Sequence, residues 1–352
     1  MFRIVRKPEL SPLNSVLAQV AAIIVALVFA GLIIFAIGYN PLEFFSKLIA
    51  GAVGTKYKIT ETVKVAVPLV ILSLGTLIAF KMKFWNIGAE GQLCMGAFAA
   101  AFFALNFPEL PAYVLLPLMF IAGFVFGGLW ALIPALLKVK FGTNETLVTL
   151  MLNYIALNWI RYLQNGPWRA DGLTPKIAMF SSNGQLPKLF GVHIGWIIAL
   201  VFVVLVHILI SRTKFGYEIS VLGESAATAR YAGINVEKVT LLAIMLSGAL
   251  CGTAGMIEAS AVQRTLNVEI TGGLGFTAVI TTYLARLSPP AVIVTSVLYA
   301  ILLVGGNTLD TMLGIPIYLI YALQALIILF VLGSEFFLNY KIVLRNGKGG
   351  AK

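Results

Sequence analysis

The sequence predicts an all-α polytopic membrane protein. Of its 352 residues, 60% are hydrophobic and only 11% are charged, and the mean hydropathy is +0.96. Soluble domains carry about 25% charged residues, so the chain lies far outside their range. Apolar runs also recur at the roughly 18 residues that a membrane-crossing helix needs, whereas strands of a membrane barrel would be shorter and would alternate.

Ten membrane-crossing helices follow from these runs. We expect them at residues 15–38, 62–80, 84–107, 112–137, 144–163, 194–211, 239–262, 272–285, 289–306 and 313–333. A tail of residues 1–14 precedes this single membrane domain of residues 15–333, and a basic tail of residues 334–352 follows it.

Charges in the connecting loops predict the orientation. If the N-terminus is cytoplasmic, 16 of the 25 Lys and Arg residues fall on the inner side, which is the bias typical of multi-pass proteins in the cell membrane. Both tails are then cytoplasmic, and the number of crossings is even. Because the basic residues cluster beside apolar spans, they favour a membrane over nucleic acid as the partner of this chain.

Two outer segments are not expected to cross the bilayer. Residues 41–54 carry Phe44, Phe45, Leu48 and Ile49 at helical spacing, which is typical of a short helix lying on the membrane surface. Residues 164–192 are rich in Gly, Pro, Asn and Ser and form an outer loop that an external partner could contact.

After the first helix, crossings two to five and seven to ten form two halves that run in opposite directions. The second member of each half is polar and contains glycine, beginning FWNIGAEGQ and GGLGFTAV. Interrupted segments at matching places in inverted halves point to a translocation pathway between them.

Polar residues in the expected spans are the candidates for this pathway. A carboxylate such as Glu90 costs roughly 2.5 to 3.5 kcal/mol inside a membrane, so it either faces a wet cavity or shapes a helix break without touching substrate. The other polar residues could equally hold helices together. The candidates are Asn86, Glu90, Gln92, Asn153, Trp159, Glu258, Arg264, Thr277 and Asn307. We find no catalytic set, no metal-ligand cluster and no ATP-binding G-x-x-x-x-G-K-[ST] motif in the sequence.

The polar stretch of residues 212–238 contains a short helix. Ser225 can cap the sequence AATARYA, and Gly233 stands at the left-handed position after it, followed by Ile234. Two helical turns are not stable alone in water, so this helix must dock, either beneath the membrane domain or on a separate protein.

Three blocks resemble the permease subunits of ABC importers, in the family that covers uptake of branched-chain amino acids, ribose and nucleosides. They are FWNIGAEGQLCMGAFAA at 84–100, LGESAATARYAGINVEKV at 222–239 and GGLGFTAVI at 272–280. The first is most similar to the nucleoside type. The second resembles the family's ATPase-coupling segment, which would here comprise Gly223, Glu224, Ser225, Ala226, Ala227, Arg230, Gly233 and Ile234.

The resemblance implies partners and leaves alternatives. ATP and Mg would bind a separate cytoplasmic ATPase, a second identical or different permease would complete the pathway, and an extracytoplasmic binding protein would deliver the substrate. Riboflavin, a ribose-like sugar or a branched-chain amino acid could replace the nucleoside. An ion-coupled secondary transporter is an alternative class, although the docking helix and the few buried ionisable groups count against it. The chain departs from the family in residues 281–290, which predicts atypical packing or gating there; the departing residues are Thr281, Thr282, Tyr283, Arg286, Ser288, Pro289 and Pro290.

Overall fold

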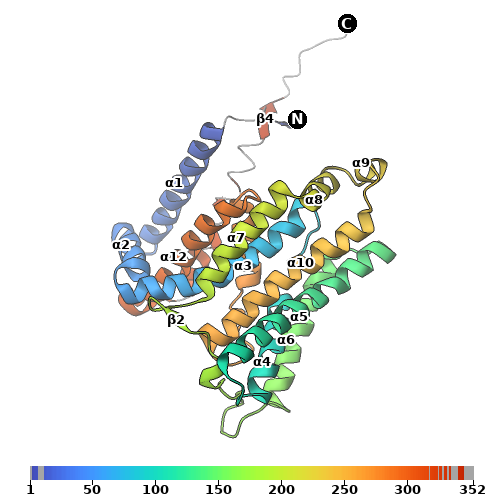
Figure 1. Cartoon of the computed structure of the whole chain (residues 1–352). Coiled ribbons are helices and arrows are strands. Elements are labelled where there is room, and N and C mark those ends of the chain that lie inside the picture. Colours follow the sequence, from blue (N-terminus) through green and yellow to red (C-terminus); the bar gives the residue numbers. More distant parts are fainter. Residues whose placement is uncertain are drawn as a thin grey trace. The chain divides into compact units, whose positions relative to one another are not determined.

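The computed structural model describes residues 2–6, 12–316, 318–323, 325–326, 329–330, 333 and 340–344, and most of these residues are helical (Figure 1). They divide into two compact units. The larger unit is Ile59–Ala300, and the smaller combines Met1–Lys58 with Ile301–Lys352.

The larger unit is built mainly from long helices, with three shorter helices and one long loop between them. Its helices are α3 (Lys56–Lys81), α4 (Ala89–Asn106), α5 (Ala112–Phe141), α6 (Glu145–Asn165), α7 (Gly195–Arg212), α8 (Lys214–Glu224), α9 (Ala226–Tyr231), α10 (Val236–Ile257), α11 (Leu274–Leu284) and the first half of α12 (Pro289–Leu313). A π-helical turn η2 (Glu258–Gln263) extends α10. The outer loop contains the 3-10 turn η1 (Ser182–Gly184) and a hairpin of β2 (Lys188–Leu189) and β3 (Val192–His193).

Local sequence signals set where these helices begin and end. Gly142 adopts a left-handed backbone (φ 66°) that ends α5. Two residues later, the Asn144 side chain accepts a hydrogen bond from the Leu147 amide and so caps α6. The Lys138 ammonium lies 2.8 Å from the Glu145 carboxylate across this turn and holds the two helix ends together.

The core of the larger unit is the close contact of α10 with α5 and α4, visible in Figure 1 where α10 lies along α5. Gly252 of α10 faces the Gly123 carbonyl of α5, and a Cβ atom at Gly252 would collide with that carbonyl. A Cβ atom at Gly96 of α4 would collide with the backbone of Gly252 in turn. Small residues four apart are typical of membrane helices whose backbones touch.

The smaller unit contains α1 (Pro12–Ala36), α2 (Pro41–Val53) and the second half of α12. α1 turns by 116° into α2, whose first turn is capped by the Asn40 side chain. Ile34, Phe44, Leu48 and Leu309 are among the buried residues of its core. The helix expected at residues 41–54 is confirmed, and its place on the membrane surface stays a prediction.

The two tails pair with each other in this unit. β1 (Phe2–Arg6) runs antiparallel to β4 (Tyr340–Leu344), with Arg6 opposite Tyr340. The two described terminal strands therefore lie side by side, as an even number of crossings requires, and their cytoplasmic location stays a prediction.

Each predicted crossing contains helix at its described residues, but the helices differ in their capacity to cross. Among the described residues, five are long and apolar enough: α3, α5, α7, α12 and α10 with η2, and the bent pair of α1 and α2 would add a sixth. The count of ten thus stays a prediction. α11 has 11 residues, about 16 Å of helix against a hydrocarbon core of about 30 Å.

The glycine contacts in the core lead to a stability prediction. Gly252→Ala adds one methyl group where backbone already touches backbone, so we expect the free energy of unfolding to fall by about 1 to 3 kcal/mol. Unfolding with sodium dodecyl sulfate in mixed micelles, followed by circular dichroism, measures the change.

The matched control is Gly31→Ala in α1. A Cβ atom there would meet Phe45 and Pro41 at 3.6 Å, an ordinary contact distance, so we expect no loss of stability. Equal losses for the two substitutions would contradict close helix contact at Gly252.

Candidate functional site

A cluster of buried polar side chains closes the break between α3 and α4. We call Asn86, Glu90, Gln92, Asn153 and Ser247 the polar knot. The Gln92 side-chain amide donates to Asn86 Oδ1 at 3.0 Å, and Asn86 Nδ2 donates to Ser247 Oγ at 3.2 Å. Ser247 belongs to α10, so the non-helical residues before α4 are fixed to the core.

Asn153 ties the same break to α6. Its Oδ1 accepts from the Gly91 amide at 2.8 Å, and its Nδ2 donates to the Ile87 carbonyl at 2.9 Å. Both partners are backbone groups left without helical partners where α4 begins, and a buried group of this kind is costly unless it is bonded. Asn153 therefore completes the helix start from a neighbouring helix.

Glu90 completes the start of α11 in the same way that Asn153 completes the start of α4. It is only 3% exposed, and its Oε2 accepts a 2.7 Å hydrogen bond from the Gly275 amide in the first turn of α11. The N-terminal end of a helix carries partial positive charge, so a carboxylate there is stabilising. A Cβ atom at Gly275 would lie 2.6 Å from Glu90 Oε2 and closer still to the Glu90 amide, which explains the glycine in the GGLGF sequence.

Thr281 and Thr282, where the sequence predicts atypical packing, join α11 to α3. The Ser73 and Thr281 hydroxyls lie 2.6 Å apart, and so do those of Thr76 and Thr282. All four side chains are buried. These hydroxyls are bonded between helices, so the unusual polarity of α11 has a packing role.

The remaining predicted residues do not join the polar knot. Glu258 is buried in η2 and accepts from the Gln263 side chain at 3.3 Å. Thr277 donates to the Gly273 carbonyl at 3.0 Å within α11. Arg264 has a left-handed backbone (φ 57°) after η2, and Asn307 is exposed in the smaller unit. Contact of any candidate with substrate stays a prediction.

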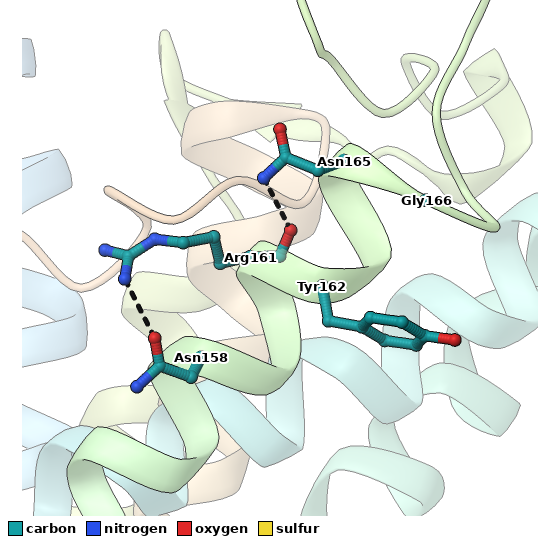
Figure 2. Close-up of a pocket in the computed structure, with 5 residues that line it drawn as sticks. All are labelled: Asn158, Arg161, Tyr162, Asn165 and Gly166. Carbon is teal, nitrogen blue, oxygen red and sulfur yellow. Dashed lines mark hydrogen bonds between the residues drawn. The ribbon is translucent and has the colours of Figure 1, made fainter.

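The C-terminal half of α6 forms an open hollow. It encloses about 440 Å³ and is lined by Asn158, Arg161, Tyr162, Asn165 and Gly166. Arg161 Nη1 donates to Asn158 Oδ1 at 2.8 Å, and Asn165 Nδ2 donates to the Arg161 carbonyl at 2.8 Å. Figure 2 shows these three residues following one another along the helix, with the Tyr162 ring pointing away from Arg161.

A group of packed aromatic rings begins at Tyr162, which lines this hollow. The Trp159 ring centre lies 5.7 Å from that of Tyr162 and 5.8 Å from that of Phe98 in α4. Trp168 of the outer loop stacks on Phe98 at 5.4 Å. The sequence predicts Trp159 as a pathway residue and names neither Arg161 nor Asn165, which line the hollow. Their signal was the spacing of polar residues 158, 161 and 165, which places them on one face of a helix.

His193 lies buried in the hairpin of the outer loop. Burial, and then the nearby charge of Lys64, lower the pKa of His193 to about 4. The imidazole is therefore neutral at neutral pH and has no assigned chemistry.

The short helix predicted in the polar stretch is confirmed as α9. Ser225 Oγ accepts from the Thr228 amide at 3.2 Å, Gly233 is left-handed (φ 76°), and the Ile234 amide donates to the Ala229 carbonyl at 3.0 Å. Ala229 is fully buried, whereas Tyr231 is 96% exposed. α8, which precedes it, was not predicted, and its Gly223 touches the Lys81 carbonyl at the end of α3.

The Glu90 contact leads to a second prediction. Glu90→Gln keeps the size of the side chain but removes the negative charge facing α11, so we expect the free energy of unfolding to fall by about 1 to 2 kcal/mol. The same micelle unfolding assay measures it. Glu109→Gln, at an exposed carboxylate, is the control, and identical curves for the two variants would contradict this role of Glu90.

Comparisons with known proteins agree with this architecture. A family model described as branched-chain amino acid transport system, permease component, matches residues 58–332. A glucose ABC transporter permease protein of Haloferax volcanii is 34% identical, over 92% of this chain and 88% of the relative. A nucleoside ABC transporter permease protein of Lactococcus lactis subsp. cremoris is 30% identical, over 90% and 91%. A guanosine ABC transporter permease protein of Bacillus subtilis is 32% identical, over 92% and 94%.

The match to the family model spans most of the chain, including the polar knot, α6 and α9. The relatives match along about nine-tenths of it. This protein therefore belongs to the branched-chain amino acid transport system permease family, and it is a multi-pass ABC-transporter permease of the cell membrane.

Proposed function

We propose that this chain is the permease subunit of an ATP-driven importer of nucleosides, in which α6 lines the pathway and α9 docks on a separate ATPase. The observation that carries the proposal is the exposed polar face of α6. The 21 residues of α6 extend about 31 Å, enough to cross the hydrocarbon core.

That face is unsuited to lipid. α6 is not among the described helices that are apolar enough to cross by themselves, and Arg161 is exposed on it. An arginine facing lipid costs roughly 2.5 to 3.5 kcal/mol at the centre of a bilayer and less toward a helix end, and arginines within a crossing helix mostly face water or other protein. We therefore place this face toward an aqueous pathway.

A second permease would complete the enclosure. The inner half of the exposed face of α6 is apolar, with Leu147, Met151 and Ile155 each more than half exposed, whereas the outer half is polar. Apolar contact between two copies of α6, or between α6 and a different permease, would seal the inner half and leave the outer half open to substrate. Both homodimer and heterodimer fit this arrangement.

The chemistry of the hollow suits a nucleoside. Its base is flat and could stack on Tyr162 or Trp159, and its polar atoms could bond the side chains of Asn158, Arg161 and Asn165. The names of the Lactococcus and Bacillus relatives specify nucleoside and guanosine. A sugar is the second candidate, because the same donors suit hydroxyl groups and the Haloferax relative is named for glucose.

The remaining partners follow from exposed side chains. Tyr231 projects from α9, where an ATPase carrying ATP and Mg would dock. On the outer loop, Leu173, Met179 and Phe190 are strongly exposed, and a substrate-binding protein could contact them. The loop is ordered by Thr265, whose hydroxyl donates to the Ile177 carbonyl at 3.1 Å.

The pathway assignment is tested at Arg161. In vesicles holding the assembled transporter, we expect Arg161→Gln to lower guanosine uptake about tenfold or more, because one charged hydrogen bond contributes about 1.5 kcal/mol or more. Arg169→Gln is the control, since the Arg169 guanidinium bonds the Gly172 carbonyl within the outer loop. Unchanged uptake in Arg161→Gln would exclude α6 from the pathway, and uptake of glucose in place of guanosine would correct the substrate.

The docking assignment is tested at Tyr231. We expect Tyr231→Asp to weaken co-purification of the ATPase by more than tenfold, because a buried aromatic anchor at an interface often contributes 2 kcal/mol or more. Tyr113→Asp, at another strongly exposed tyrosine at the start of α5, should leave the complex intact. Full retention of the ATPase by Tyr231→Asp would argue against docking through this face of α9.

A further inference from the structure

A second cavity lies beside α9 and has no part in the proposed transport path. It encloses about 280 Å³ and is bounded by α9, the ends of α5 and α8, the starts of α6 and α10, and the turn that follows α3. Three stretches of the sequence, residues 82–84, 138–145 and 222–240, thus meet around one space.

Three basic side chains from three of these segments line the cavity. They are Lys83 in the turn after α3, Lys138 near the end of α5 and Arg230 in α9. Lys83 has a left-handed backbone (φ 58°), a conformation that is uncommon for residues other than glycine and requires support from its surroundings. The fixed backbone of this turn therefore sets the direction in which the Lys83 side chain leaves the chain.

The acidic residues of the cavity do not neutralise all three bases. Glu145 pairs with Lys138 at 2.8 Å. Lys83 is 4.0 Å from Glu224, and both side chains are well exposed, so this pair is weak. Arg230 has no ion pair or side-chain hydrogen bond to any residue that the structure describes. Glu237 is the other acidic lining residue, so the lining itself holds three basic and two acidic side chains.

The rest of the lining is apolar. Met82 and Phe84 are almost fully buried. Together with Val139, Leu222 and Val236 they form the apolar wall of the cavity. A ligand that matches both parts of the lining is an amphiphile with an anionic head. Phosphate accepts hydrogen bonds from several directions, and guanidinium groups bind it with two parallel bonds.

From this combination we infer that the cavity binds the phosphate group of an anionic phospholipid, with Lys83, Lys138 and Arg230 as its ligands. The inference rests on the proposed function only for the inner location of α9, where the surface of the membrane carries anionic lipid. Arg230 would then hold α9 against the membrane domain, while Tyr231 stays exposed for the ATPase. Bound lipid thus sets the position of the docking helix.

Lipid binding to the full chain tests the site. The chain, with and without the ATPase, is titrated in detergent with phosphatidylglycerol, phosphatidylcholine or inorganic phosphate, and native mass spectrometry counts the bound molecules. We expect phosphatidylglycerol to be retained, and Arg230→Gln and Lys83→Gln each to weaken its binding at least tenfold. Arg230→Lys keeps the charge and should retain part of the affinity.

Lys140→Gln is the matched control, because Lys140 is exposed two residues beyond Lys138 and does not line the cavity. Unchanged binding in Arg230→Gln and Lys83→Gln would overturn the site. Equal binding of inorganic phosphate would overturn the lipid as its ligand, and loss of lipid on ATPase addition would indicate that an acidic group of the ATPase fills the cavity. Loss of ATPase docking in Tyr231→Asp with lipid binding intact separates this inference from the proposed function.

Discussion

Within a membrane, no bulk water is present to satisfy backbone groups where a helix begins, and this constraint shapes the centre of the larger unit. The chain leaves helical geometry between α3 and α4 and again before α11. Each break exposes amide and carbonyl groups, and each is closed by a side chain from elsewhere. Asn153 completes the start of α4 and Glu90 the start of α11. The polar residues that first suggest a substrate site are therefore needed to let helices start inside the protein.

These bonds require short distances, which the glycines provide. Asn153 reaches the Gly91 amide, and Glu90 reaches the Gly275 amide, at positions where a Cβ atom would crowd the partner. The same residue type lets α4 and α5 touch α10 at Gly96, Gly123 and Gly252. Close contact between the helix backbones and the hydrogen bonds at the helix starts thus depend on each other. A larger separation between the helices would leave the Gly91 and Gly275 amides without partners.

Local signals in the sequence predicted local features well. Ser225 and Gly233 delimit α9 because capping involves residues only a few positions apart. The pairing of Glu90 with Gly275 joins residues 185 positions apart, which no local pattern encodes. Hydropathy also predicted a crossing at residues 272–285, where the structure has the 11-residue helix α11, because an apolar run does not reveal that its first residues form a turn. Arg161 was missed because its role depends on which face of α6 is exposed.

The contacts also form two continuous routes between α9 and α11. In one, α10 begins just after α9 and packs along α4, whose Glu90 bonds the first turn of α11. In the other, Gly223 of α8 touches the end of α3, and Ser73 and Thr76 of α3 bond the middle of α11. The short helix α11 is held at its start by α4 and along one side by α3. It therefore cannot move independently of either neighbour. Thr281 and Thr282 are therefore essential to the second route, because apolar residues at these positions could not bond Ser73 and Thr76.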